Sequence, residues 1–200
     1  REFFSPKNTG LYFSLIYIPK EKICDPAFIT TTACVAVCKQ LENFYNNSIE
    51  CKIKWVNDIY LNNKKICGIL TEGVFDSNSQ KIGAFVIGIG INICTENYPD
   101  ELKHKAGSIS KDTLSEIDKR KLIKNISQNI FDYYDTIDKS EIFQEYKMRS
   151  FIINKKVTIH PIINSADNYK AKVLDITDNA KLKILLDTGE IKILDSGEIS

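Results

Sequence analysis

Apolar residues recur every three or four positions in three stretches of the chain, which predicts three helices. They lie near residues 26–45, 117–137 and 140–149, and Asp25-Pro26 fits the N-cap and first position of the first one. Elsewhere, runs of aromatic and β-branched residues are bounded by turn residues, as is typical of strands. In the first half of the chain these runs lie near 11–18, 51–56, 58–62, 65–74 and 81–93.

Short connections indicate how the central strands pair. Asn62-Asn63 separates two of the runs, and asparagine tolerates the positive φ that a short hairpin needs. Residues 76–79 (DSNS) mark a second turn. Parallel neighbours would need a crossover of about a dozen residues or more, so an antiparallel meander is expected. Residues 95–118 are polar and aperiodic, which favours a functional loop over the site.

After Phe151 the hydrophobic period changes to two, with turn residues at short intervals. This pattern predicts a small barrel-like β module. We therefore expect an α+β domain over residues 1–150, with a mixed or antiparallel sheet and packed helices. A small β domain over residues 151–200 would follow it.

Composition narrows the classes of function. The chain is 43% hydrophobic and 26% charged, which is typical of a globular protein. Lys and Arg number 27 against 26 Asp and Glu, so neither a nucleic-acid binder nor a membrane-surface protein is expected. Six cysteines without a CxxC pair, and only two histidines, argue against structural zinc and favour reduced thiols in a cytoplasmic protein.

Lys54 is the first candidate for a binding residue. A lone lysine on a strand is usually solvated, but Trp55 indicates a half-buried sheet, where an inward lysine needs an anion. Asn57 and Asp58 follow at once, and they either close a turn or fix a ligand.

Glycines are the second signal. Gly88 and Gly90 interrupt a run that otherwise predicts a strand, and Gly68 does the same in the preceding strand. Because glycine weakens a strand, its presence indicates a bulge or the close approach of a ligand. The GxG pair lacks the third glycine of a dinucleotide loop. A charge and bare backbone brought together by a meander favour a small-molecule site.

The stretch KWVNDIYLNNKKICGILTEG (54–73) closely resembles the KWPND…(K/R)KxxGIL-E signature of biotin protein ligases, also called holocarboxylase synthetases. VIGIGINI (86–93) is similar to another strand of that family, and GEIS (197–200) is similar to the end of its small C-terminal domain. Arg1 with the residues after it resembles the close of the family's Gly-Arg-rich loop. The resemblance implies a class II synthetase-like biotin/lipoate ligase fold with a C-terminal SH3-like β-barrel.

The resemblance also implies a reaction in two steps. Biotin and MgATP give biotinyl-5′-adenylate and pyrophosphate, and the acyl group then moves to a lysine of a biotin carboxyl carrier domain. ATP, Mg²⁺ and biotin are thus the implied ligands, and the acceptor domain of a biotin-dependent carboxylase is the implied partner. Neither nucleic acid nor membrane is expected, and pairing of two copies through an exposed edge strand stays open.

By the same resemblance, Lys54 contacts the biotin carboxylate and then the acyl-phosphate, and Arg1 helps to hold the phosphates. Residues 95–110 match the loop that covers the adenylate. No metal ligand is assigned. The other implied site residues are Gly68, Gly88 and Gly90 at the biotin rings, and Asn57, Asp58 and Asn92 toward the nucleotide and magnesium.

The sequence departs from the family at two places. Val56 stands where the family has proline, which fixes φ and lacks an N–H, so we expect a less rigid turn. The strand and most of the Gly-Arg-rich loop that precede Arg1 in the family are not among the 200 residues. A polypeptide limited to these residues is therefore expected to form little or no biotinyl-adenylate.

Two other classes of protein stay open. One is a lipoate or octanoate ligase or transferase, which shares the fold. The other is a non-catalytic biotin-binding module or a repressor. The combination of KWVND…GIL, GIGIN and GEIS favours biotin.

Overall fold

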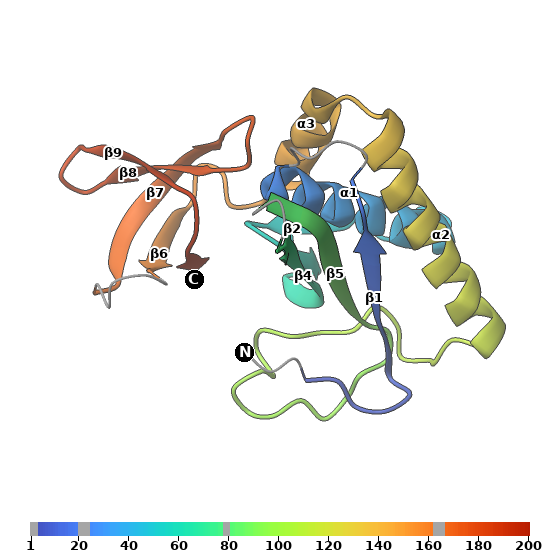
Figure 1. Cartoon of the computed structure of the whole chain (residues 1–200). Coiled ribbons are helices and arrows are strands. Elements are labelled where there is room, and N and C mark those ends of the chain that lie inside the picture. Colours follow the sequence, from blue (N-terminus) through green and yellow to red (C-terminus); the bar gives the residue numbers. More distant parts are fainter. Residues whose placement is uncertain (1–3, 20–24, 78–80, 162–166) are drawn as a thin grey trace.

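In the residues that the computed structural model describes, two antiparallel sheets and three helices build the fold (Figure 1). The structure describes residues 4–19, 25–77, 81–161 and 167–200. The first sheet has the strand order β1-β5-β4-β3-β2, and every neighbouring pair in it is antiparallel. This confirms the meander. Its strands are β1 (Gly10–Tyr17), β2 (Lys52–Lys54), β3 (Asp58–Leu61), β4 (Lys64–Asp76) and β5 (Lys81–Asn92).

Local residue preferences account for where these elements start and turn. Asn62 and Asn63 have φ of 49° and 61°, so both adopt the left-handed conformation that the β3–β4 hairpin needs. Asp25 caps the first helix by accepting a hydrogen bond from the Ala27 N–H at 2.9 Å. Pro26 follows as the first helical residue.

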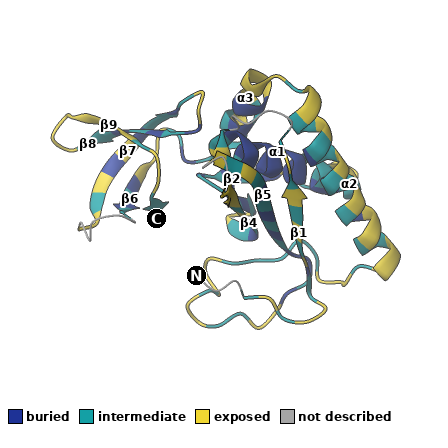
Figure 2. Cartoon of the chain, viewed as in Figure 1, coloured by how far each residue is buried: buried dark blue, intermediate teal, exposed yellow. Residues whose placement is uncertain are grey.

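The helices cover one face of the first sheet. α1 lies across the sheet and most of its residues are buried, whereas α2 keeps an exposed outer side (Figures 1 and 2). Small residues let α1 lie close to the strands, since Ala33, Ala36 and Cys38 are 0% exposed. No helix in the described ranges is long and apolar enough to cross a membrane. The helices are α1 (Pro26–Phe44), α2 (Glu116–Thr136) and α3 (Lys139–Arg149).

The C-terminal residues form a second antiparallel sheet with the strand order β10-β6-β7-β8-β9. Its end strands β9 and β10 do not pair within residues 156–161 and 167–200, so this part of the structure shows an open sheet and no closed barrel. Its strands are β6 (Lys156–His160), β7 (Tyr169–Ile176), β8 (Leu182–Leu186), β9 (Ile191–Leu194) and β10 (Glu198–Ile199).

The turn between β2 and β3 is tied to three other elements. The Trp55 indole N–H donates to the Ala180 carbonyl, in the turn between the second-sheet strands β7 and β8, at 2.6 Å. The Tyr146 hydroxyl of α3 donates to the Val56 carbonyl, also at 2.6 Å. Asn57 exchanges hydrogen bonds with Ile69 of β4. Contacts from three sides thus hold a turn in which Val56 replaces the family's proline. The peptide bond that precedes Val56 is cis.

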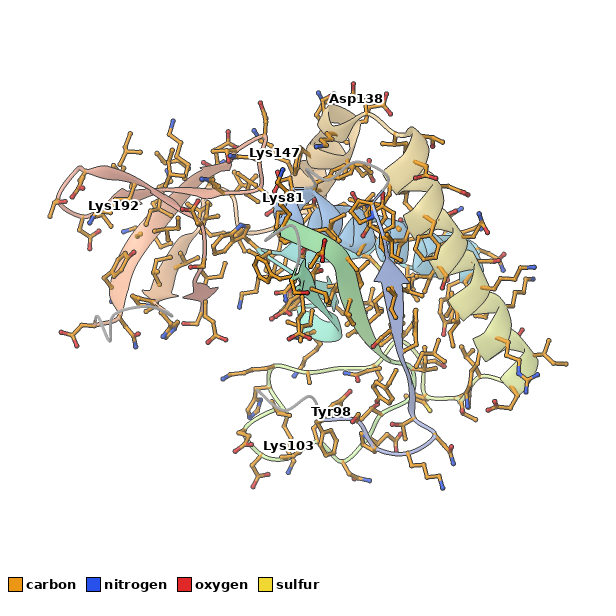
Figure 3. All side chains as sticks on the ribbon, in the orientation of Figure 1. Lys81, Tyr98, Lys103, Asp138, Lys147 and Lys192 are labelled. Carbon is orange, nitrogen blue, oxygen red and sulfur yellow. The ribbon has the colours of Figure 1, made fainter. Side chains whose placement is uncertain are left out.

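A second contact joins α3 to the second sheet. Lys147, labelled in Figure 3 between the two, pairs with Asp175 at 2.6 Å. Both side chains are 40% exposed, so this ion pair contributes little to stability. The buried Trp55 hydrogen bond is therefore the more important of these two contacts.

We predict that Tyr146→Phe lowers the free energy of unfolding by about 1–2 kcal/mol, because the part-buried Val56 carbonyl loses its stronger donor and keeps only the long contact to Cys34 Sγ. Urea denaturation measures this change. Tyr133→Phe on α2 is the matched control, since the Tyr133 hydroxyl has no hydrogen bond to any part of the chain that the structure describes. Equal stability of the two variants would contradict the anchoring role of Tyr146.

Candidate small-molecule site

One row of residues crosses all five strands of the first sheet on the face opposite the helices. Strand pairing places Lys54 opposite Asp58, Asp58 opposite Gly68, Gly68 opposite Gly90, and Gly90 opposite Tyr12. Directly opposed residues share a face, so these five point to the same side. The row carries charged side chains on β2 and β3 and glycines on β4 and β5.

The residues that alternate with this row face the helices and form core. Ile53, Ile59, Cys67 and Ile91 are each 0% exposed, and Leu11 is 4% exposed. Burial of one face fixes the register, because a slip by one residue would turn the glycines into the core and the isoleucines out.

A cavity of about 570 Å³ lies on the open face. Gly68, Gly88 and Gly90 line it, together with Tyr12 and Ser14 of β1. A β carbon at Gly88 would lie 3.7 Å from the Leu70 carbonyl oxygen and 3.9 Å from Ser14 Oγ. These are ordinary contacts, so the fold itself has room for a side chain there. Because Gly88 has no side chain, this space over the sheet stays open.

A smaller cavity of about 290 Å³ lies on the second sheet. Three lysines line it, and Lys156 stands directly opposite Lys172 across the strand pair. The larger cavity is the better candidate site, since it combines bare backbone, apolar side chains and charged groups.

Asp58 is paired with a lysine that the sequence analysis did not single out. The Lys65 ammonium lies 2.6 Å from Asp58 Oδ1, with the two side chains 31% and 26% exposed. Lys65 lines the cavity, whereas Lys54 does not. Asp58 thus faces the open side as expected, but its carboxylate binds Lys65 rather than its cross-strand neighbour Lys54.

Lys54 is half-buried at the edge of this charged cluster. Its ammonium lies 5.8 Å from the centre of the Tyr60 ring. Burial lowers the pKa of Lys54, the Asp58 carboxylate raises it, and Lys65 and Lys105 lower it further. An anion bound nearby would offset the cost of burying this charge.

The two predicted asparagines occupy different places. Asn57 lines the cavity, and its side-chain amide donates to the Ile69 carbonyl. Asn92 is only 3% exposed and donates to the Gly107 carbonyl at 3.1 Å. Asn92 Oδ1 is buried without a hydrogen-bond partner among the described residues. Asn92 therefore fastens the loop after β5 to the end of that strand through its bond to Gly107.

The loop after β5, in which Figure 3 labels Tyr98 and Lys103, is fastened to β4 by its backbone. The Lys65 N–H donates to the Lys105 carbonyl at 2.8 Å, and the Gly107 N–H donates to the Lys65 carbonyl at 2.9 Å. A β carbon at Gly107 would lie 2.5 Å from the Lys64 β carbon, so only glycine allows this approach. The loop predicted to cover the site thus docks next to Lys65.

A β-bulge explains why Lys65 escaped the sequence analysis. Strict alternation from Gly68 would put Lys65 on the helix side of the sheet. The β3–β4 register shifts between Ile59 and Tyr60, and Ile66 and Cys67 are both 0% exposed. The extra residue brings Lys65 to the same face as Gly68. Nothing in the sequence marks this bulge.

Two further predictions concern Arg1 and metal binding. Arg1 lies outside the described residues. Among the residues that are described, no group of three or more His, Cys, Asp or Glu side chains is arranged to hold a metal ion.

The sequence matches a known family. The model of the Biotin/lipoate A/B protein ligase family matches residues 1–92. The bifunctional ligase/repressor BirA of Bacillus spizizenii is 36% identical over 128 residues, which are 63% of this chain and 38% of that protein. BirA of Escherichia coli is 24% identical over 102 residues, 51% of this chain and 30% of that protein. The chain thus spans well under half of the length of these relatives.

The fold matches solved structures over nearly all of the chain. A biotin protein ligase from Aquifex aeolicus aligns with a TM-score of 0.73 and 26% identity, covering 96% of this chain and 81% of that one. A biotin protein ligase from Leishmania major aligns with a TM-score of 0.54 and 18% identity, covering 94% and 79%. The second likeness shows the fold alone.

We predict that Asp58→Asn moves the pKa of Lys54 further down, because Asp58 is the charge that raises it against the effect of burial. Lys54 would then lose its proton at a lower pH than in the wild type. NMR titration of ¹³C-methylated lysines measures both values, with Asp132→Asn on the exposed side of α2 as the control. An unchanged or higher Lys54 pKa in Asp58→Asn would contradict this effect of Asp58 on Lys54.

Proposed function

The chain belongs to the biotin/lipoate A/B protein ligase family, and from this premise we propose that it activates biotin with ATP and transfers it to protein. The first step forms biotinyl-5′-adenylate and pyrophosphate. The second moves biotin to a lysine of a biotin carboxyl carrier domain. The observation that carries the proposal is the glycine-lined cavity beside a cluster of lysines on the open face of the sheet.

The cavity suits biotin in size and character. Its volume of about 570 Å³ lies within the range of about 300–1,000 Å³ that is common for small-molecule sites. Gly68, Gly88 and Gly90 would let a flat bicyclic ring lie against the backbone, with Tyr12 and Leu70 of the open face supplying apolar contact. A similar ligase from Aquifex aeolicus has been solved in complex with biotin and ATP, and its fold matches this chain.

The charges suit the chemistry. Attack of the biotin carboxylate on the α-phosphate of ATP brings two anions together, so the protein must position them and offset their repulsion. In our proposal Lys54 supplies positive charge at this point, and Asn57 fixes the adjoining turn. Magnesium, carried by the phosphates of ATP, would add further positive charge. The loop over 95–110 would cover the adenylate and keep water from it.

The finer parts of the fold follow the same proposal. We propose that residues 1–150 form the catalytic domain and residues 151–200 an SH3-like domain. The five short antiparallel strands of the second sheet support this division. The buried Trp55–Ala180 hydrogen bond would then connect the C-terminal domain to the turn next to Lys54. A cytoplasmic location and pairing of two copies remain predictions.

Biotin-dependent exchange of pyrophosphate into ATP tests the proposed function in the natural protein that contains these residues. We expect exchange with biotin and little with lipoate or octanoate. Lys54→Ala should reduce the exchange rate about 100-fold or more, since it removes a charge that acts on the reacting groups. Lys52→Ala, two residues earlier on β2, is the matched control. Exchange with lipoate instead would favour the lipoate ligases of the same family.

We also predict that Gly88→Val weakens biotin binding without unfolding the protein. The new β carbon makes only ordinary contacts, but its methyl groups would project over the sheet into the cavity. Ala84→Val on the same strand, outside the cavity lining, is the control. Calorimetry should show biotin affinity lowered at least about tenfold for Gly88→Val alone, and wild-type affinity in that variant would place biotin elsewhere.

A further inference from the structure

Lys65 combines three properties that no other described lysine shares. It lines the larger cavity, it pairs with a carboxylate at 2.6 Å, and its backbone is fixed on both sides. β3 pairs with it on one side, and the loop after β5 holds its N–H and carbonyl on the other. Its side chain lies at the cavity wall.

Several charged side chains meet around Lys65. Asp58 pairs with Lys65, and Asp58, Lys65 and Lys105 all act on the charge of Lys54 at this end of the sheet. Positive charges gathered in a partly desolvated place attract an anion more strongly than the same charges in water. A lysine ammonium has three donors, so Lys65 can keep Asp58 and still donate to a ligand.

We propose that Lys65 is a second anion-binding residue of the site, whose ammonium binds an oxyanion of the ligand while Asp58 holds it at the cavity wall. The oxyanion is either the carboxylate of the acid substrate or a phosphate of the nucleotide. For the identity of the ligand, the proposal rests on the proposed function. Lys65 would then act together with Lys54, on the opposite side of Asp58.

The affinities of Lys65→Met for a charged and a neutral ligand test whether Lys65 binds the carboxylate of the acid substrate. Biotin and biotinamide share their rings, but only biotin carries the charge. If Lys65 binds the carboxylate, Lys65→Met weakens biotin about tenfold or more and biotinamide by less than about twofold. Lys65→Arg, which keeps the charge, should recover most of the biotin affinity. Lys52→Met, whose partner Glu50 lies away from the cavity, should change neither affinity.

Titration with inorganic pyrophosphate, in the absence of biotin, tests whether Lys65 binds a phosphate of the nucleotide. In the ¹³C-methylated protein, pyrophosphate should shift the NMR signal of Lys65 in a saturable way and leave that of Lys52 in place. A shift with pyrophosphate but equal loss of biotin and biotinamide affinity would assign Lys65 to the nucleotide. If pyrophosphate causes no shift, and Lys65→Met weakens biotin but not biotinamide, Lys65 binds the biotin carboxylate.

Two results separate failure of this inference from failure of the proposed function. If the wild type binds biotin, but Lys65→Met leaves the biotin–biotinamide difference intact and pyrophosphate does not move the Lys65 signal, the inference is wrong and the proposed function stands. If the wild type binds neither biotin nor biotinamide, the proposed function fails, and the pyrophosphate titration alone decides whether Lys65 binds an oxyanion.

Discussion

The site depends on how the turn at residues 55–57 is held. Each of its three residues is tied to a different element: Trp55 to the second sheet, Val56 to α3 and Asn57 to β4. Lys54 precedes this turn and Asp58 follows it, so the turn sets where both charges lie on the sheet. Because buried polar groups are costly to leave unpaired, the Trp55 and Tyr146 hydrogen bonds give the turn one favoured position. The C-terminal sheet thus supports a site that lies on the other sheet.

The first sheet divides its two faces between stability and binding. Isoleucines and other apolar residues on one face pack against α1, and this burial stabilises the fold and fixes the strand register. Glycines on the other face add no packing, yet they leave the cavity in which a flat ligand can approach the backbone. The register set by the buried face therefore also places the charged residues of the row beside its glycines.

Much of this arrangement follows from local sequence. Asp25-Pro26, Asn62-Asn63 and the helical spacing of apolar residues predicted the elements correctly, because caps, positive φ and periodicity are local properties. The glycines predicted a cavity-lining strand pair for the same reason. Lys65 was missed, since the bulge that turns it to the open face depends on pairing between strands. The hydrogen bonds of Asn92 and Trp55 also join distant residues, and spacing along the chain gives no sign of them.

A crystal structure of the protein with biotin would test most directly whether the open face of the first sheet is the binding site. We expect the biotin rings to lie over Gly68, Gly88 and Gly90, with the carboxylate toward the Lys54–Asp58–Lys65 cluster. Biotin on the lysine-lined cavity of the second sheet, or with its carboxylate turned away from the cluster, would contradict the assignment of the site.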